Sequence, residues 1–229
     1  MNRRPQHLVT PPGPRQEQGS VLVLHSSTAA WAGPRFAADL NSLPLPEQQR
    51  ILARKRGADQ RASLVGRLLL RQGLELFGHS AGDLHKLRYT TYGKPFLPHL
   101  DLNFNISHSG DVVVCAMAKG TRIGIDVEHL RAVPIADLAA TLDHAQLQEV
   151  AAAAHPDRQL LAFWTKKEAV AKCRGEGLNL PMERMTGSAV LVLDGESWHC
   201  SQLDVGSDYI CHGVTKSAAS GWKVIQGLC

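Results

Sequence analysis

Two pairs of charged residues have spacings that place each pair on one face of a secondary-structure element. Asp126 and Glu128 are two residues apart, so in a β-strand both carboxylates leave the same face. Glu168 and Lys172 are four residues apart, which is about one turn of a helix. Mg²⁺ prefers a few carboxylates together with water and the oxygens of a bound phosphate. If the two pairs meet in the fold, they predict a site for a metal ion and a diphosphate.

Each pair also has an ordinary structural interpretation. Alternating acids are common on exposed strands, and Glu168 with Lys172 is typical of a surface ion pair that stabilises a helix by about 0.2–0.5 kcal/mol. The apolar residues that alternate within 123–127 favour burial of the strand's other face, so its acidic face needs a partner. Leu161 and Trp164 place Glu168 at the border of the apolar side of its helix.

Several other residues can contact an anion. Ser107 and His108 follow an expected strand in a polar turn, where a hydroxyl and an imidazole can donate to phosphate oxygens. Lys94 lies at the tip of an expected turn, where we expect it to be exposed. Taken singly, each fits a solvated turn equally well. Seven basic residues fall in one stretch, which can meet an anion or form a solvated helix face: Arg50, Arg54, Lys55, Arg56, Arg61, Arg67 and Arg71.

Periodicity predicts the elements that must position these residues. Leucine and valine recur at helical spacing at positions 64, 65, 68 and 69, and predict an apolar stripe on a helix within residues 46–77. Further helices are expected at 134–154 and 158–174, the second ending before Gly175. Period-two patterns and turn residues predict strands at 21–24, 87–90, 102–106, 112–118, 123–128, 189–193, 198–203 and 209–215.

The order of a helix followed by three strands then occurs twice. We therefore expect an α+β fold, a pseudo-dimer of two similar α/β halves, each a helix packed on a small and mainly antiparallel sheet, with the site at the seam. Residues 1–20 are rich in proline and poor in apolar side chains, which predicts a disordered tail. The expected division places the N-terminal half at 21–130 and the C-terminal half at 131–229.

Composition narrows the function classes. The chain has 229 residues, 44% of them hydrophobic, and a net charge of +4, which is too small to indicate a nucleic-acid partner. No apolar run reaches the roughly 20 residues that cross a bilayer, and the N-terminus lacks the apolar core of a secretory signal. Five scattered cysteines without a C-x-x-C pair indicate buried, reduced thiols. We expect a cytoplasmic protein without a membrane partner.

Common catalytic motifs are missing from the chain. It has no Ser/His/Asp order, no H-E-x-x-H, no G-x-x-x-x-G-K and no G-x-G-x-x-G pattern, so protease, P-loop and dinucleotide-binding functions have no support.

Four segments, taken together and in order, resemble the motifs of the 4′-phosphopantetheinyl transferases. They are Tyr-Gly-Lys-Pro at 92–95, Phe-Asn-Ile-Ser-His-Ser-Gly at 104–110, Ile-Gly-Ile-Asp-Val-Glu at 123–128 and Trp-Thr-Lys-Lys-Glu-Ala-Val-Ala-Lys at 164–172. The resemblance is to the long, surfactin-synthetase-activating (Sfp-type) class, and it covers approximately residues 45–215. One such segment alone would be weak evidence, whereas four in order are specific.

The resemblance implies a monomer that binds coenzyme A and Mg²⁺, or Mn²⁺, between its halves. It implies transfer of 4′-phosphopantetheine to a serine of an acyl or peptidyl carrier protein, with 3′,5′-ADP as the other product. Glu168 is then also a candidate base for the attacking serine, and Glu168 and Lys172 are the catalytic residues. The implied roles are Asp126, Glu128 and Glu168 as metal ligands, Lys172, His108 and Ser107 on the diphosphate, and Lys94 and Arg61 on the adenosine and its 3′-phosphate.

Two departures from the family pattern accompany this resemblance. Gln48 and Ile51 stand where the family often has lysines, so Arg50, Arg54 or Lys55 are alternative contacts for the 3′-phosphate. Gln146 stands where the family has an acid, so a fourth carboxylate at the site is less expected. Two other functions stay open: a non-catalytic module that binds coenzyme A or a carrier protein, and a metal-dependent diphosphate hydrolase.

Overall fold

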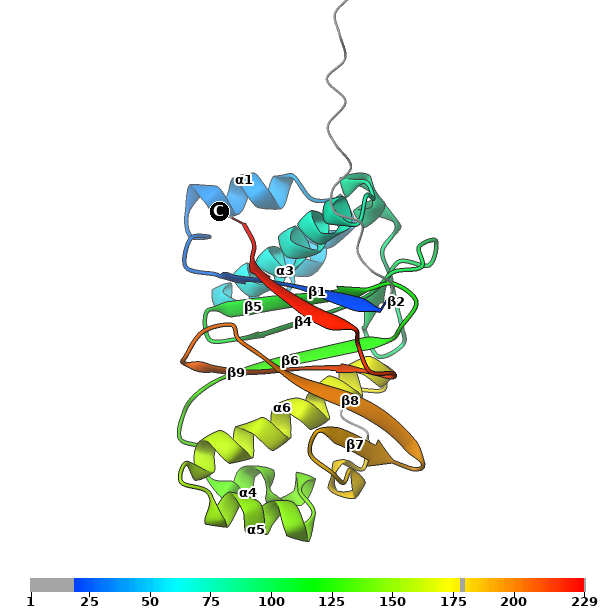
Figure 1. The fold of residues 1–229 in the computed structure, drawn as a ribbon. Coiled ribbons are helices and arrows are strands. Elements are labelled where there is room, and N and C mark those ends of the chain that lie inside the picture. The colour runs from blue at the N-terminus through cyan, green and yellow to red at the C-terminus, as the bar shows by residue number, and fades with distance from the viewer. Residues whose placement is uncertain (1–18, 178–179, 229) are drawn as a thin grey trace, which may run out of the picture.

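The computed structural model describes residues 19–177 and 180–228, which form four layers (Figure 1). Helices of the first half cover one sheet, a second sheet lies beneath it, and the helices of the second half cover the outer face of that sheet. This arrangement confirms the expected α+β pseudo-dimer. The predicted tail, 1–20, lies outside the described residues except for its last two positions, and Ser20 already begins a strand.

Two four-stranded sheets form the centre of the molecule. The first has the order β10-β1-β5-β4, and its β1–β10 pair is parallel whereas its other pairs are antiparallel. The second has the order β6-β9-β8-β7 and is antiparallel throughout. The bounds are β1 Ser20–Ser27, β4 Asn103–Ser109, β5 Val112–Ala118, β6 Ile123–His129, β7 Val190–Leu193, β8 Glu196–Leu203, β9 Tyr209–Thr215 and β10 Gly221–Gln226.

The helices agree with the expected segments except at a few interruptions. The segment expected at 46–77 is two helices, because residues 53–56 leave the helix. A short helix before them was not expected, whereas the strand expected at 87–90 and the turn after it are confirmed by a small antiparallel hairpin. The bounds are α1 Pro34–Asn41, α2 Leu45–Leu52, α3 Gly57–Leu76, η1 Ala81–Lys86, β2 Arg88–Tyr89, β3 Pro95–Phe96, α4 Ile135–Leu138, η2 Ala139–Thr141, α5 His144–Ala152, α6 Pro156–Arg174 and η3 Met182–Arg184.

The internal repeat differs from the expected helix followed by three strands. Each half begins with a strand, continues through helices and returns with an antiparallel pair, so that β1-β5-β4 corresponds to β6-β9-β8. Strand β6 therefore opens the second sheet, although the expected division at residue 130 placed it in the first half. The turn after β5 leads into a different sheet because Ile123, Ile125 and Val127 pack face to face on the first sheet instead of extending it.

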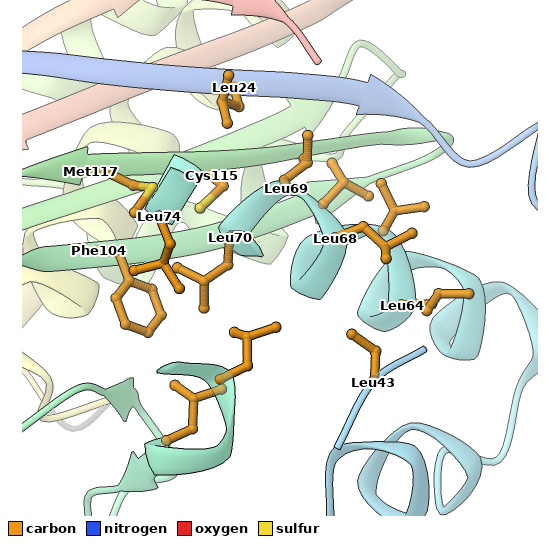
Figure 2. Packing of buried hydrophobic residues seen from close by; sticks show 14 of the residues in the cluster. Leu24, Leu43, Leu64, Leu68, Leu69, Leu70, Leu74, Phe104, Cys115 and Met117 are labelled. Carbon is orange, nitrogen blue, oxygen red and sulfur yellow. The ribbon is translucent and has the colours of Figure 1, made fainter. Parts of the chain in front are cut away.

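Three apolar layers hold the sheets and helices together. Between the sheets, Val21 and Val23 of β1 pack with the isoleucines of β6. Above the first sheet, leucines 64, 68, 69, 70 and 74 of α3 are buried in one cluster with Leu24 of β1 and Phe104 of β4 (Figure 2), which confirms the predicted stripe. Beneath the second sheet, Ala169 and Val170 of α6 pack with Trp198 of β8. Both faces of each sheet are thus covered over most of their area, except at β7, where Val190 and Val192 are exposed, and β6 is buried on both sides.

The structure shows the surroundings of the cysteines and the length of the helices, on which the expectations about thiols and membrane spans depend. Cys115, Cys173 and Cys211 are buried free thiols, and Cys200 is a partly exposed one. Within residues 19–177 and 180–228, no helix is long and apolar enough to cross a membrane.

Gly124 lets helix α6 lie directly on strand β6. A Cβ atom at this position would overlap the carbonyl oxygen of Ala169 and lie 2.7 Å from the backbone nitrogen of Cys173. Because side chains two residues apart share a face of a strand, Asp126 is directed at the same helix as Gly124. The close approach of the two backbones therefore determines how near Asp126 lies to the side chains of α6.

We expect Gly124→Ala to lower the free energy of unfolding by about 3 kcal/mol, the upper range for overpacking, because the added methyl meets backbone atoms that cannot rotate away. Denaturant unfolding of purified protein measures this change. Gly221→Ala is the matched control, since an added Cβ there meets no atom within 4 Å. Equal stability of the two variants would contradict the close contact between β6 and α6.

Candidate functional site

Asp126 is a buried carboxylate that joins both halves of the molecule. It is 4% exposed, and its Oδ1 accepts hydrogen bonds from Ser107 Oγ of β4 at 2.7 Å and from Lys172 Nζ of α6 at 2.5 Å. Its Oδ2 is buried without a hydrogen-bond partner among the described residues. Burial raises the pKa of Asp126, although the ammonium of Lys172 and the hydroxyl of Ser107 oppose the rise. One oxygen of this carboxylate is therefore free to accept a further ligand.

Glu128, two residues further along β6, is held at the edge of the same site. Its Oε2 accepts hydrogen bonds from Ser109 Oγ at 2.9 Å and from the guanidinium of Arg131 at 2.7 Å. Ser109 Oγ in turn accepts from the backbone N–H of His129 at 3.1 Å. The predicted spacing is confirmed in that Glu128 and Asp126 lie on one strand and are both held by serines of β4.

Strand β4 supplies alternate polar side chains along the seam between the sheets. Asn105 Oδ1 accepts from the backbone N–H of Ile125 at 2.8 Å, which satisfies a donor on the edge strand of the second sheet. Ser107 and Ser109 continue the same face at a spacing of two. We expected Ser107 to lie in a turn, whereas β4 runs on through Ser109 and buries it. The alternation of these three polar residues was visible in the sequence and marks the strand.

Glu168 approaches the two carboxylates of β6 from helix α6. Its Oε2 lies 3.9 Å from Lys172 Nζ, one helical turn away, and its side chain is 13% exposed. Burial raises the pKa of Glu168, and the negative charges of Asp126 and Glu128 raise it further, against the opposing charge of Lys172. The fold thus brings Asp126, Glu128 and Glu168 within electrostatic reach of one another, and we call them the carboxylate cluster.

Side-chain cations partly neutralise the negative charge of the carboxylate cluster. Within the described part of the chain, no group of three or more His, Cys, Asp or Glu side chains is arranged to hold a metal ion. Lys172 occupies one oxygen of Asp126, and Arg131 occupies one oxygen of Glu128. The donor set nevertheless suits a hard divalent cation, because it consists of carboxylate oxygens that repel one another and includes the free Oδ2 of Asp126.

A cavity of about 610 Å³ lies beside the carboxylate cluster. Its walls come from α2, α3, the β2–β3 hairpin, β4 and the C-terminal end of α6, so both halves contribute. Five arginine or lysine side chains and no aspartate or glutamate line it among the described residues, which favours an anionic ligand. The basic residues of the wall are Arg50, Arg54, Arg67, Lys94 and Lys172. Of these, Lys172 also reaches Asp126, and it therefore links the cavity to the carboxylate cluster.

His108, which the resemblance assigns to the diphosphate, lies on the cavity wall. Partial burial lowers its pKa, and the positive charges of Lys172 and Arg54 lower it further. Arg61 is not among the lining residues, whereas Arg50 and Arg54 are. Arg50 belongs to the last turn of α2 and Arg54 to the segment between α2 and α3, whereas Arg61 is on α3.

Arg50 is held in place by a buried polar network behind the cavity. Its guanidinium carbon lies 3.7 Å from the centroid of the Tyr89 ring. Tyr89 donates its hydroxyl hydrogen to Glu47 and accepts from Arg67 at 3.0 Å, and Arg67 Nε also pairs with Glu47 at 2.6 Å. Because Glu47 neutralises Arg67, the unpaired positive charge of this wall comes chiefly from Arg50 and Arg54.

Lys94 is not exposed at the tip of its turn. Its Nζ donates to the carbonyl oxygens of Lys172 at 2.6 Å and Cys173 at 3.2 Å, in the last turn of α6. The expectation of an exposed side chain was wrong because the hairpin folds against the end of a helix that lies far away in the sequence. Partial burial lowers the pKa of Lys94.

The residues that depart from the family pattern have structural partners. Gln48 Nε2 donates to the carbonyl of Leu43 at 2.7 Å, and Ile51 is buried in the core. Gln146 is also buried and accepts from Lys167 Nζ at 2.5 Å, so this position adds no carboxylate to the cluster.

Lys167, the residue before Glu168, is a fully buried lysine that no sequence pattern indicated. Besides Gln146, its ammonium contacts the carbonyl oxygens of Thr141 at 2.7 Å and Met182 at 2.9 Å. Burial lowers the pKa of Lys167 to about 8. These contacts fix the rotation of α6, and that rotation directs Glu168 toward β6.

His212 is a second buried residue near the site that the sequence did not indicate. It lies opposite Asp126 on the neighbouring strand β9, and its Nδ1 is 2.7 Å from the hydroxyl of Thr165 on α6. Burial, with a smaller contribution from the positive charge of Lys166, lowers the pKa of His212 to about 3. The ring is therefore neutral in the folded protein near neutral pH.

This burial predicts a pH dependence of stability. The unfolded chain binds a proton at His212 below pH about 6.5, whereas the folded chain does so only near pH 3. The unfolded state therefore holds more protons between these values, and stability falls as the pH is lowered through this window. We expect His212→Gln, measured by denaturant unfolding from pH 7 to 4, to lose less stability than the wild type. The exposed His85→Gln should follow the wild type, and identical profiles for all three proteins would contradict the neutral, buried ring.

Comparison with known proteins agrees with this architecture. Residues 30–120 match the family model described as 4′-phosphopantetheinyl transferase, N-terminal, and residues 122–211 match the 4′-phosphopantetheinyl transferase superfamily. The division between the two matches falls just before β6, where the structure changes sheets.

Individual relatives carry the same enzyme name. The 4′-phosphopantetheinyl transferase AcpT of Escherichia coli K12 is 33% identical over 175 residues, which cover 72% of this chain and 78% of the relative. A 4′-phosphopantetheinyl transferase of Bacillus subtilis is 37% identical over 55% of this chain and 57% of its own length. The transferase Sfp of Bacillus subtilis strain 168 is 36% identical over 44% and 47%. The chain therefore belongs to the 4′-phosphopantetheinyl transferase superfamily and is an enzyme of that class.

Proposed function

We propose that this enzyme transfers the 4′-phosphopantetheine group of coenzyme A to a serine of an apo acyl or peptidyl carrier protein and releases 3′,5′-ADP, in a reaction that depends on Mg²⁺. The single observation that carries the proposal is the position of Lys172. Its ammonium lines the basic cavity and also contacts Asp126, so a diphosphate in the cavity would meet the carboxylate cluster at this residue.

The basic cavity supports binding of coenzyme A across the seam. Its volume of about 610 Å³ is within the ordinary range for small-molecule sites. We assign Arg50 and Arg54 to the 3′-phosphate, since both line the wall, in place of Arg61 and of the family lysines at Gln48 and Ile51. His108 and Lys172 would then hold the diphosphate, whereas Ser107, which does not line the cavity, would hold Lys172 and Asp126 in place.

The carboxylate cluster would hold the divalent ion. Asp126 offers its free Oδ2, and Glu128 and Glu168 add oxygens from the adjacent strand position and from α6. When bound, Mg²⁺ would supply charge neutralisation for the phosphoryl oxygens. Mn²⁺ accepts the same oxygen donors and is an alternative ion.

The chain's own residues account for the remaining chemistry. The serine oxygen of the carrier forms a bond to the phosphorus that bears pantetheine, and the bond from that phosphorus to the oxygen of the leaving 3′,5′-ADP breaks. Lys172 neutralises negative charge that develops on the diphosphate oxygens. Glu168 is the candidate base that accepts the serine proton, a role that its position on α6, one turn from Lys172, supports.

The same observations support two further proposals about the protein's state. Both halves of the pseudo-dimer contribute to the cavity, so the proposed site needs no second copy of the chain, and we propose a monomer. The four described cysteines are free thiols, which supports a reducing compartment such as the cytoplasm.

Release of 3′,5′-ADP tests this function against its alternatives. Wild-type enzyme is incubated with coenzyme A, with and without an apo carrier protein and with and without Mg²⁺. We expect release only when both the carrier and Mg²⁺ are present. Release without a carrier would indicate a diphosphate hydrolase, and binding of coenzyme A without release under any condition would indicate a non-catalytic binding module.

A further inference from the structure

Lys94 connects the N-terminal half to the end of helix α6 through two hydrogen bonds. It extends from the turn between β2 and β3, and its Nζ donates to the carbonyl oxygens of Lys172 at 2.6 Å and Cys173 at 3.2 Å. The acceptor Lys172 is the residue whose side chain contacts Asp126 and lines the cavity. A side chain of one half therefore holds the backbone of the residue that links the cavity to the carboxylate cluster.

The end of a helix explains why an ammonium binds there. The last four carbonyl groups of an α-helix have no partner within the helix. The N–H of Gly175, in the left-handed conformation with φ 80°, satisfies the carbonyl of Ala171 at 2.9 Å. Lys94 satisfies the next two carbonyls, and its positive charge lies at the negative end of the helix dipole.

The stem of Lys94 passes directly over Gly175. A Cβ atom on Gly175 would lie 3.3 Å from Cδ of Lys94, so the stem and the end of the helix are in close contact. This contact and the two hydrogen bonds direct the ammonium to the backbone of α6, where it satisfies carbonyl oxygens.

Lys172 is consequently held from the N-terminal half at both ends. Its carbonyl oxygen accepts from Lys94, and its ammonium donates to Ser107 Oγ at 2.8 Å in addition to Asp126. Two contacts from one half thus set the position of a side chain that belongs to the other half.

We propose that Lys94 is a positioning residue for Lys172 and acts on the transfer reaction through the end of α6, without contacting the 3′-phosphate of coenzyme A. This inference rests on the proposed transferase function. Arg54 is the contrasting residue, because it lines the cavity and forms no ion pair among the described residues. A direct contact and a positioning contact differ in which kinetic constant they change.

The test compares Lys94→Met with the wild type on coenzyme A and on 3′-dephospho-coenzyme A. Methionine keeps most of the stem but has no donor for the two carbonyls. We expect kcat to fall about 10²-fold, the cost of misplacing a catalytic group by about 1 Å, with the KM for coenzyme A within about 3-fold of the wild type. The loss should be the same on both substrates. A rise in KM confined to coenzyme A would show direct contact with the 3′-phosphate and would overturn the proposal.

Three further variants make the result decisive. Arg54→Met should show the opposite pattern, a higher KM for coenzyme A and little change on the dephosphorylated substrate. Lys94→Arg keeps donors and charge, so it should recover most of kcat, and it also serves if Lys94→Met does not fold. Lys94→Met combined with Lys172→Met should be no slower than Lys172→Met alone, because the first residue acts through the second.

Failure of this inference is distinguishable from failure of the proposed function. If the wild type releases no 3′,5′-ADP with any carrier, the transferase proposal fails. If the wild type is active and Lys94→Met has the wild-type kcat on both substrates, only the positioning role of Lys94 fails.

Discussion

Asp126→Asn is expected to lower the rate of phosphopantetheine transfer about 10³-fold, the upper range for the loss of one group that stabilises charge in a transition state. Asparagine keeps the shape of the side chain but removes the negative charge and one of the oxygens that the proposed metal site needs. The protein should remain folded, because burial raises the pKa of Asp126 and the folded state therefore already disfavours its ionised form.

The measurement pairs initial transfer rates with denaturant unfolding of the same preparation. Asp204→Asn is the matched control, since Asp204 is exposed, lies far from α6 in the sequence, and hydrogen-bonds through one oxygen to the N–H of Gly206, a contact that asparagine can keep. The control should transfer at the wild-type rate. A folded Asp126→Asn enzyme with at least a tenth of wild-type activity would refute the role of this carboxylate.

Lys172→Met has the second large effect, because it changes both activity and stability. It leaves the carboxylate of Asp126 buried without its cation, which should cost about 3 kcal/mol of folding free energy. Transfer should fall about 10²–10³-fold because the cavity loses the charge nearest to the carboxylate cluster. Added Mg²⁺ should then raise the melting temperature of Lys172→Met more than that of the wild type, since a bound cation replaces the missing ammonium as the counter-charge of Asp126.

Lys166→Met is the control on the same helix. Lys166 contacts the ring of Phe163 and no carboxylate of the cluster, so its loss should leave the response to Mg²⁺ unchanged. If Mg²⁺ stabilises neither Lys172→Met nor the wild type, the proposed ion does not bind at Asp126, and the metal assignment is wrong.

The sequence predicted the local parts of this site well. The period of two placed Asp126 and Glu128 on one face of a strand, and the period of 3.6 placed Glu168 and Lys172 on one face of a helix that ends at Arg174. The apolar alternation in β6 correctly indicated a buried opposite face. These features depend on spacing within one element, which the sequence states directly.

Features that depend on the arrangement of distant elements were not predictable in the same way. The turn after β5 does not state whether the next strand extends the same sheet, and β6 in fact joins β9. Strand β10 pairs in parallel with β1, which lies far earlier in the sequence, and no sequence pattern in β10 indicates β1 as its partner. Packing of the hairpin directs Lys94 to the carbonyl of Lys172 at the end of α6. The sequence around Lys94 and around Lys172 does not indicate this contact.

The buried polar residues near the site were also not predicted from the sequence. Lysine and histidine usually lie at the protein surface, so only the hydrogen-bond partners of Lys167 and His212 explain why these two side chains are buried. An ammonium with three oxygen acceptors and an imidazole beside a hydroxyl satisfy the rule that buried polar groups are hydrogen-bonded, but those acceptors lie 15 to 47 residues away in the sequence.

The mass of an apo carrier protein after incubation with coenzyme A tests the central claim most directly. The wild-type enzyme with Mg²⁺ should add the mass of one phosphopantetheine group to the acceptor serine, and neither Asp126→Asn nor wild type with the divalent ions chelated should do so at a comparable rate. No gain in mass on acyl and peptidyl carriers by folded wild-type enzyme, or an equal gain with Asp126→Asn, would contradict a carboxylate-dependent transfer at the seam between the two sheets.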